Sequence, residues 1–304
     1  MVNFIDFFYY IYSGFMELKQ ELPEFMKNKV CLVTGATSGV GKSMAISLAG
    51  SGARVIMLSR NISRGEQTRD EIVKLTGNER IEVIFADLSL QYVIRNFADE
   101  FKRKHSELHI ISNNIGNLRL KREETSEGIE MTLAVSYLSH FLLTLELIDL
   151  LKYSTPARII TVAGGKGVIK RASVNFNDIQ MKTSYNGFKA AVQAALCRVL
   201  WTFELANRLR GTGVTANTFH PGFVKSGLGR HLPWILRKGM VLMQPFLSKT
   251  TKTGEFLATS EEIEYITGRF FIHQKPVDFN PKYDLDSTAK QLWQRSEELV
   301  NEIR

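Results

Sequence analysis

Short apolar runs alternate with longer amphipathic segments from about residue 27 to the C-terminal end of the chain. The runs have the length and β-branched content of buried strands, and the segments between them are spaced as helices that cover a sheet. Strands are predicted at Val30–Thr34, Arg54–Ser59, Ile81–Ala86, His109–Asn113, Arg158–Val162, Val214–His220 and Arg269–His273. Helices are predicted at Ser63–Lys74, Gln91–Lys104, Glu130–Leu151, Tyr185–Leu209 and Thr288–Glu302.

This alternation predicts an α/β fold, a single doubly wound parallel sheet with helices on both faces. On such a sheet, ligands bind at the carboxyl ends of the strands, so site residues are expected there. No internal repeat, low-complexity stretch or long linker interrupts the pattern. We therefore expect one domain over residues 27–304, preceded by an extension over residues 1–26.

Charge and cysteine content narrow the function. The formal net charge is +8 at pH 7, and the basic residues are scattered among the acids. This pattern argues against a nucleic-acid partner and fits an anionic cofactor or an anionic membrane surface better. Cys31 and Cys197 give no disulfide framework, suit a reducing intracellular compartment and are expected in the core. No metal site is expected.

A glycine-rich turn follows the first predicted strand, in Thr34-Gly35-Ala36-Thr37-Ser38-Gly39-Val40-Gly41. Glycines there let the backbone turn sharply, approach a pyrophosphate without a Cβ and pack a helix closely on a strand. The anion then rests on the free N–H groups of the following helix, which is predicted to begin near Lys42. The turn predicts a dinucleotide site of the Rossmann type.

Three further motifs follow in order. Asn113-Asn114-Ile115-Gly116 ends the fourth strand, Tyr185-Asn186-Gly187-Phe188-Lys189 opens a predicted helix, and Pro221-Gly222-Phe223-Val224-Lys225-Ser226 follows the sixth strand. Tyrosine and lysine four residues apart would share one face if both lie in the helix. The four motifs together resemble the short-chain dehydrogenase/reductase family.

The resemblance narrows to the retinol dehydrogenase-like branch. It does so through Leu205-Ala206-Asn207-Arg208-Leu209-Arg210-Gly211-Thr212-Gly213-Val214 with His220-Pro221-Gly222, and through Ser139-His140-Phe141-Leu142-Leu143-Thr144. It implies an NAD(P)-dependent oxidoreductase that interconverts a lipophilic alcohol and its aldehyde or ketone. Retinoids, other lipophilic aldehydes and sterols are the implied substrates.

The same resemblance implies the roles of individual residues. Tyr185 would give its proton to the carbonyl oxygen, while Lys189 would favour the phenolate by its charge and hold the nicotinamide ribose. The implied cofactor-binding residues are Gly35, Thr37, Ser38, Gly39, Val40, Gly41, Arg60, Asp87, Leu88, Asn114, Gly116, Tyr185, Lys189, Pro221, Gly222, Val224 and Ser226.

Two of these residues bear on the adenosine end of the cofactor. Arg60 follows the second strand, where an NAD-binding protein usually has an acid, so NADP(H) is expected rather than NAD(H). The alternative is a solvated loop arginine. Asp87 resembles the family's adenine-contacting aspartate, and its alternative is an N-cap before a helix at Ser89–Tyr92.

The chain also departs from the family. Gly164 stands where the family has a serine that hydrogen-bonds the substrate oxygen, and Ser136 replaces an asparagine of the middle helix. Ser173, in the loop before Tyr185, could supply a hydroxyl instead. The departures leave a second hypothesis open, a catalytically impaired NADP-binding scaffold or sensor.

Two segments concern location and substrate. The aromatic residues between Val2 and Phe15 favour a membrane-interface anchor, or else a helix packed on the protein or a dimer partner. An apolar and basic segment at about residues 227–250 is interpreted as a lid over a lipophilic substrate that could also touch a membrane, or else as part of the core. We expect an intracellular protein, cytoplasmic or peripheral on a membrane. By resemblance, the helices Glu130–Leu151 and Tyr185–Leu209 would form a homodimer contact.

Overall fold

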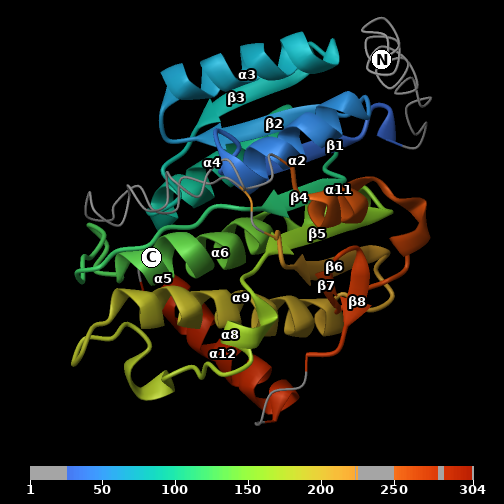
Figure 1. Cartoon of the computed structure of the whole chain (residues 1–304). Helices are drawn as coiled ribbons and strands as arrows, with labels where there is room; N and C mark the ends of the chain where they lie inside the picture. The colour runs from blue at the N-terminus through green and yellow to red at the C-terminus, as the bar shows by residue number, and fades with distance from the viewer. Residues whose placement is uncertain (1–25, 223, 225–249, 280–283, 303–304) are drawn as a thin grey trace, which may run out of the picture.

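The computed structural model describes residues 26–222, 224, 250–279 and 284–302. They form one sheet of eight strands in the order β3-β2-β1-β4-β5-β6-β7-β8, with β8 antiparallel to β7 and every other neighbouring pair parallel. Figure 1 shows the sheet between two layers of helices. This confirms the predicted fold class. The proposed N-terminal anchor and the lid segment, apart from residue 250, lie outside the described residues.

The strands follow the predicted apolar runs. They are β1 (Val30–Thr34), β2 (Arg54–Ser59), β3 (Ile81–Phe85), β4 (Ile110–Asn113), β5 (Ala157–Val162), β6 (Val214–Phe219), β7 (Phe270–Ile272) and β8 (Lys275–Val277). The larger helices are α2 (Gly39–Gly50), α3 (Ile62–Thr76), α4 (Gln91–Lys104), α6 (Ser139–Glu146), α9 (Gly187–Arg208), α11 (Lys252–Thr259) and α12 (Leu285–Asn301). Shorter turns are α5 (Met131–Leu133), α7 (Ile148–Tyr153) and α8 (Lys166–Ile169).

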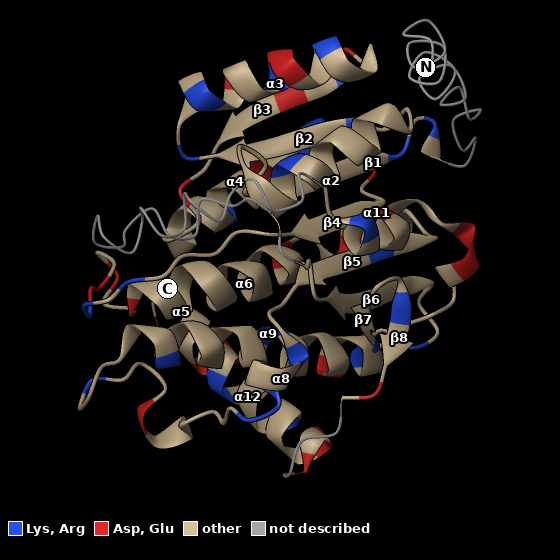
Figure 2. Cartoon of the chain, in the orientation of Figure 1, with Lys and Arg blue, Asp and Glu red and all other residues tan. Residues whose placement is uncertain are grey.

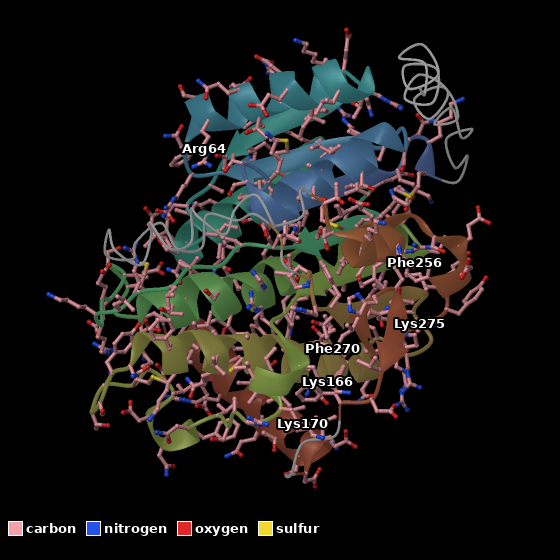
Figure 3. The ribbon with its side chains drawn as sticks, viewed as in Figure 1. Arg64, Lys166, Lys170, Phe256, Phe270 and Lys275 are labelled. Carbon is pink, nitrogen blue, oxygen red and sulfur yellow. The ribbon has the colours of Figure 1, made fainter. Side chains whose placement is uncertain are left out.

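Two apolar clusters pack on opposite faces of the sheet. One joins the sheet to α4, α6, α9 and α12 and includes Phe270, and the other joins it to α2, α3 and α11, with Phe256 packed against it. Figure 3 labels both phenylalanines. Cys31 and Cys197 lie unpaired in these clusters, and burial raises the pKa of the Cys197 thiol to about 12. Both are core residues, as expected.

Two predicted helices differ from the structure. The segment Glu130–Leu151 is not one continuous helix, because a π-helical stretch over Ala134–Leu138 separates α5 from α6 and a break at Leu147 separates α6 from α7. Helix α9 begins at Gly187, after Asn186, whose Oδ1 accepts the N–H of Lys189. Tyr185 therefore lies outside the helix, and its predicted place one turn before Lys189 on a shared face is wrong.

Helix α12 covers helices that precede it by far in the chain. The ring centroids of Trp293 and Phe141 lie 5.1 Å apart, and the hydroxyl oxygens of Ser296 and Tyr137 are hydrogen-bonded at 2.7 Å. Arg208 of α9 stacks over Trp293 at 4.1 Å. The predicted homodimer contact would use the segment Glu130–Leu151 and α9, and α12 packs against both of them. The homodimer stays a prediction.

Candidate cofactor and substrate site

The turn between β1 and α2 depends on its glycines. Gly35 and Gly39 have positive φ angles of 64° and 58°. A Cβ on Gly41 would lie 2.4 Å from the carbonyl oxygen of Gly35, so only glycine fits there. Ser38, at the N-cap position, is extended and makes no side-chain cap, and no acid stands in the first turn of α2. The helix start thus offers free N–H groups to an anion.

The loop after β4 closes against this turn. The hydroxyl of Thr34 accepts the N–H groups of Asn114 at 2.8 Å and Ile115 at 3.1 Å. A Cβ on Gly35 would lie only 3.3 Å from the backbone of Ile115. The carbonyl oxygen of the Asn114 side chain is buried without a partner. The predicted residues Gly35 and Asn114 therefore lie together at the carboxyl ends of β1 and β4, and Gly116 follows in the same loop.

A second arginine stands near the end of β2. Arg60 is exposed, which fits both a ligand contact and the alternative of a solvated loop arginine, and its role stays a prediction. Asn61 caps α3 by accepting the N–H of Arg64, and the guanidinium of Arg64 lies 3.5 Å from the carbonyl oxygen of Thr37. Figure 3 labels Arg64 beside this turn. Arg64 was not among the residues predicted for the site, although it follows Arg60 by only four residues.

Asp87 shapes the turn after β3. Its Oδ1 accepts the N–H of Ser89 at 3.0 Å and the hydroxyl of Ser89 at 2.8 Å. Helix α4 begins only at Gln91, with Leu90 in the N-cap position, so the alternative of an Asp87 N-cap is wrong. The neighbouring Leu88 is buried at 3% exposure. An adenine contact of Asp87 or Leu88 stays a prediction.

The end of β6 carries the fourth motif. Pro221 and Gly222 follow the strand, with Gly222 at a φ of 77°, and Val224 is buried in an isolated bridge. Ser226 lies outside the described residues. Of this motif, the described part thus lies beside the other strand ends, as predicted.

Tyr185 is held by the start of α5. Its hydroxyl lies 3.1 Å from the carbonyl oxygen of Arg119, 3.1 Å from Oε1 of Glu130 and 3.2 Å from the hydroxyl of Thr132. Glu130 is itself fixed, because its carboxylate caps α5 through the N–H groups of Thr132 and Leu133. Burial, with the carboxylate of Glu130 adding to it, raises the pKa of Tyr185 to about 12, although the Thr132 hydrogen bond opposes the rise.

The residues of α9 that lie near the strand ends are Ala195 and Arg198, not Lys189. A Cβ on Gly164 would lie 3.7 Å from the Cβ of Ala195, and a Cβ on Gly116 would lie 3.7 Å from Nη1 of Arg198. Lys189 is exposed and precedes Ala195 by six residues, which places it roughly 9 Å back along the axis and about 120° around the helix. The α9 residue one turn before Ala195 on the same face is Ala191.

Comparison with known proteins identifies the family. The model of the short chain dehydrogenase family matches residues 29–233. The chain belongs to this family. It is 36% identical to retinol dehydrogenase 14 of Mus musculus, over 93% of this chain and 89% of the relative. It is 38% identical to retinol dehydrogenase 12 of Homo sapiens, over 90% and 87%. It is thus an oxidoreductase-family protein of the retinol dehydrogenase-like branch.

Solved structures share the fold. A protein of uncharacterised function from Mycobacterium paratuberculosis aligns at a TM-score of 0.70 and 25% identity, over 92% of this chain and 96% of that one. A Pseudomonas aeruginosa protein described as an RhlG/NADP active-site complex aligns at 0.62 and 23%, over 81% and 94%. The second likeness concerns the fold alone.

Two of the residues that depart from the family, Ser136 and Gly164, lie in segments that border α9. Ser136 lies in the π-helical stretch, and its hydroxyl accepts the N–H of Asn117 at 3.0 Å. Gly164 brings no hydroxyl to the end of β5, and Ser173 is exposed in the loop beyond α8. The catalytic roles of Tyr185 and Lys189 stay a prediction. They require the phenol to leave its partners at the start of α5.

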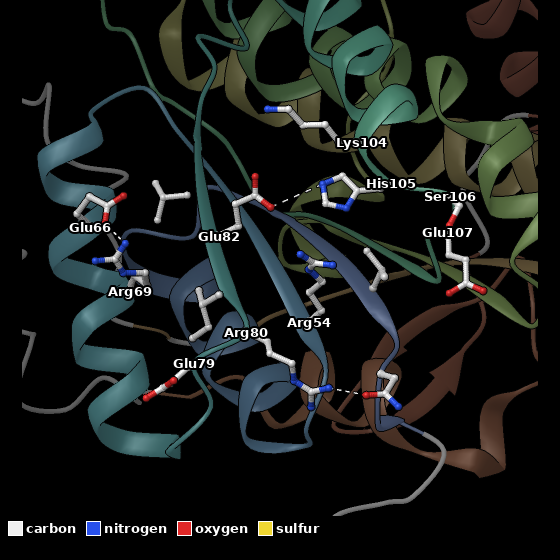
Figure 4. Close-up of a pocket in the computed structure, with 14 residues that line it drawn as sticks. Arg54, Glu66, Arg69, Glu79, Arg80, Glu82, Lys104, His105, Ser106 and Glu107 are labelled. Atoms are coloured by element: carbon white, nitrogen blue, oxygen red, sulfur yellow. Dashed lines mark hydrogen bonds and ion pairs between the residues drawn. The ribbon is translucent and has the colours of Figure 1, made fainter.

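A cavity of about 870 Å³ lies elsewhere, at the amino ends of β1, β2 and β3 (Figure 4). Among the residues that line it, Arg69 forms an ion pair with Glu66, and the ring of His105 lies 3.7 Å from the carboxylate of Glu82. Figure 2 likewise shows basic and acidic residues interspersed on α3. We assign no ligand to this cavity. Among the described residues, no group of His, Cys, Asp or Glu is arranged to hold a metal.

Proposed function

We propose that this chain binds NADP(H) together with a lipophilic alcohol, aldehyde or ketone, and that it interconverts them slowly. One observation carries the proposal: the glycine turn for the dinucleotide is intact, while at the same edge of the sheet the end of β5 sets Gly164, without a hydroxyl, against Ala195. The names of its retinol dehydrogenase relatives support the lipophilic substrate. Arg64 beside Thr37 and the exposed Arg60 after β2 support the 2′-phosphate of NADP(H).

The residues present fit a dinucleotide. The backbone around Gly35 and Gly41 has no room for a Cβ, the start of α2 offers N–H groups, and the buried side-chain oxygen of Asn114 lacks a partner. When bound, the nicotinamide supplies or takes the hydride at carbon. The chain's own residues would hold the phosphates at Ser38 to Gly41 and orient the ring beside Gly116.

Slow turnover follows from the missing donors. One preorganised donor to a developing oxyanion contributes on the order of 10²–10³ in rate, and a positioned proton donor about 10²–10⁴. Gly164 provides no such hydroxyl, and a phenol with a pKa of about 12 is a weak acid at neutral pH. NADPH oxidation with retinal and a series of aliphatic aldehydes tests the proposal. Tight NADPH binding with rapid turnover would contradict the slow step.

Removal of the arginines should change the cofactor preference. We expect Arg60→Ala and Arg64→Ala each to weaken NADPH binding by about 10–100-fold, because a charged hydrogen bond contributes about 1.5–3 kcal/mol. NADH binding should change less than about threefold, since it lacks the 2′-phosphate. Titration calorimetry with both cofactors measures this.

The matched control for these variants is Arg69→Ala. Arg69 is a further arginine of α3, but it pairs with Glu66 and Asp70 and lines the cavity at the amino ends of the strands. Its removal should leave both dissociation constants unchanged. Equal affinity of the unaltered protein for NADH and NADPH would overturn the cofactor assignment.

A second candidate is an efficient reductase with Tyr185 as proton donor, as the family resemblance implies. The contacts of Tyr185 argue for a structural role, so we expect Tyr185→Phe to keep NADPH affinity and residual turnover within about twofold. It should lower stability by about 1–3 kcal/mol, because the variant loses a hydrogen bond to the carboxylate of Glu130. A fall of turnover by 100-fold or more, with binding intact, would favour the second candidate.

Membrane attachment and the homodimer remain part of the proposal. None of the helices in the described ranges is long and apolar enough to cross a bilayer. The aromatic residues between Val2 and Phe15 support a peripheral anchor, and binding of the full chain to anionic vesicles tests it.

A further inference from the structure

Arg198 is a buried cation without a countercharge. It lies in the middle of α9 with 9% of its surface exposed. Its Nε has no hydrogen-bond partner, and within the described residues no carboxylate forms an ion pair with its guanidinium. Burial lowers the pKa of Arg198 to about 10, so the group still carries its charge at pH 7.

Such a charge is costly for the fold. Removing a guanidinium from water is unfavourable unless hydrogen bonds or an opposite charge compensate for the lost hydration. A methionine or leucine in the same place would pack in the core without this cost. An uncompensated buried arginine therefore indicates a group that a ligand completes.

The guanidinium points at the open edge of the cofactor site. A Cβ on Gly116 would lie 3.7 Å from Nη1 of Arg198 and 3.7 Å from the hydroxyl of Ser136. One point thus lies close to a cation and to the hydroxyl of Ser136, which now bonds Asn117 and would have to turn from the side-chain oxygen of that residue, 3.2 Å away, to donate to a ligand. Gly116 is partly exposed, so a ligand can reach this point.

The titratable groups next to Arg198, His140 and Cys197, do not carry a charge that could balance it. His140 is fully buried, and burial, with the charge of Arg198 adding to it, holds its pKa well below its usual value. The thiol of Cys197 has a pKa raised to about 12 by burial. Both groups are neutral at pH 7, and neither neutralises the arginine.

The anions of the cofactor have other places. In the proposed function the pyrophosphate lies at the start of α2 and the 2′-phosphate beside Arg60, whereas Arg198 faces Gly116 in the loop after β4. The group that completes Arg198 should therefore belong to the second ligand. A planar carboxylate matches the paired donors of a guanidinium.

We propose that Arg198 and Ser136 form a carboxylate-binding subsite beside Gly116, and that the second ligand is a lipophilic carboxylic acid or a lipophilic carbonyl compound that carries a carboxylate. The acid group is inferred from Arg198 alone. The lipophilic part rests on the proposed function.

The test compares ligands that differ only in their head group. Dodecanoate, dodecanol and dodecanal are titrated into the NADPH-loaded full chain and into Arg198→Met, with Arg208→Met as control. Arg208 is in the same helix but pairs with Glu204 far from Gly116. We expect dodecanoate to bind at least tenfold more tightly than dodecanol, and Arg198→Met to remove this preference. NADPH affinity should stay unchanged in both variants.

A second readout separates ligand binding from a structural role. Arg198→Met should raise the melting temperature of the ligand-free protein by several degrees, because it removes an uncompensated buried charge. Dodecanoate should raise the melting temperature of the unaltered protein and not that of the variant. A lower melting temperature in Arg198→Met would show a structural arginine and overturn the proposal.

Two further results would also overturn it. Equal binding of dodecanoate and dodecanol, with NADPH binding intact, would refute the carboxylate subsite while leaving the proposed cofactor function in place. A loss of NADPH affinity in Arg198→Met, without any effect on dodecanoate, would assign the arginine to a cofactor phosphate. If the unaltered protein does not bind NADPH, the proposed function itself is refuted.

Discussion

Gly41→Ala should abolish NADPH binding, with the dissociation constant raised by more than about 100-fold. The added Cβ would lie 2.4 Å from the carbonyl oxygen of Gly35 and 2.8 Å from that of Thr34, and both are backbone atoms that cannot rotate away. The turn must therefore open, which separates the N–H groups that would hold the pyrophosphate. Overpacking of this kind also costs about 1–3 kcal/mol of stability. Fluorescence titration with NADPH and thermal unfolding measure the two effects.

Gly50→Ala is the matched control, at the other end of the same helix. The nearest atom to its added Cβ would be the methyl of Thr76 at 3.8 Å, so the site is open. Alanine is the better helix former by up to about 1 kcal/mol, so stability should rise and NADPH binding should not change. Normal NADPH affinity in Gly41→Ala would show that the cofactor binds elsewhere.

The double variant Gly164→Ser with Ala191→Tyr should raise turnover of retinal or a long-chain aldehyde by at least about 100-fold. Ala195 contacts the Gly164 position, and Ala191 precedes it by one turn on the same face of α9. A serine and a tyrosine there would supply the two donors that the site lacks. Together such donors can raise a reaction rate by well over about 100-fold. The buried charge of Arg198 lies on the same helix and favours an ionisable phenol.

Single substitutions and a misplaced phenol are the controls. Gly164→Ser alone should change turnover less than about tenfold, because no proton donor faces it, and its Cβ fits with a small shift of Ile169, 3.2 Å away. Phe188→Tyr adds a phenol on an exposed side of α9 and should have no effect. Unchanged turnover in a folded, NADPH-binding double variant would show that these α9 residues do not face the reacting carbonyl.

The strands were predictable because their signal is local. The apolar runs Val30–Thr34 and Arg54–Ser59 coincide with β1 and β2, and Gln91–Lys104 coincides with α4. Strand β8 was not predicted, because three residues that include Pro276 carry no alternation that a sequence pattern reveals. The glycine turn was predictable for the same reason as the strands, since its steric needs concern adjacent backbone atoms.

The wall of the site was not predictable in this way. A tyrosine and a lysine four residues apart share a face only when both lie in a helix. Here Asn186 caps α9 after Tyr185, so the tyrosine lies outside the helix. Asparagine before a helix is a recognisable N-cap, so this signal was available. Which face of α9 meets Gly116 and Gly164 depends on how the helix is rotated against the sheet, and only the tertiary structure brings Ala195 and Arg198 there.

Helix α12 has a consequence for synthesis of the protein. It follows every strand in chain order, yet Trp293 and Ser296 complete the packing around Phe141 and Tyr137. While the chain is still on the ribosome, the aromatic surface of these earlier helices waits uncovered until α12 has left the exit tunnel. Exposed apolar surface of this kind is what chaperones bind, so the docking of α12 is the step that removes it.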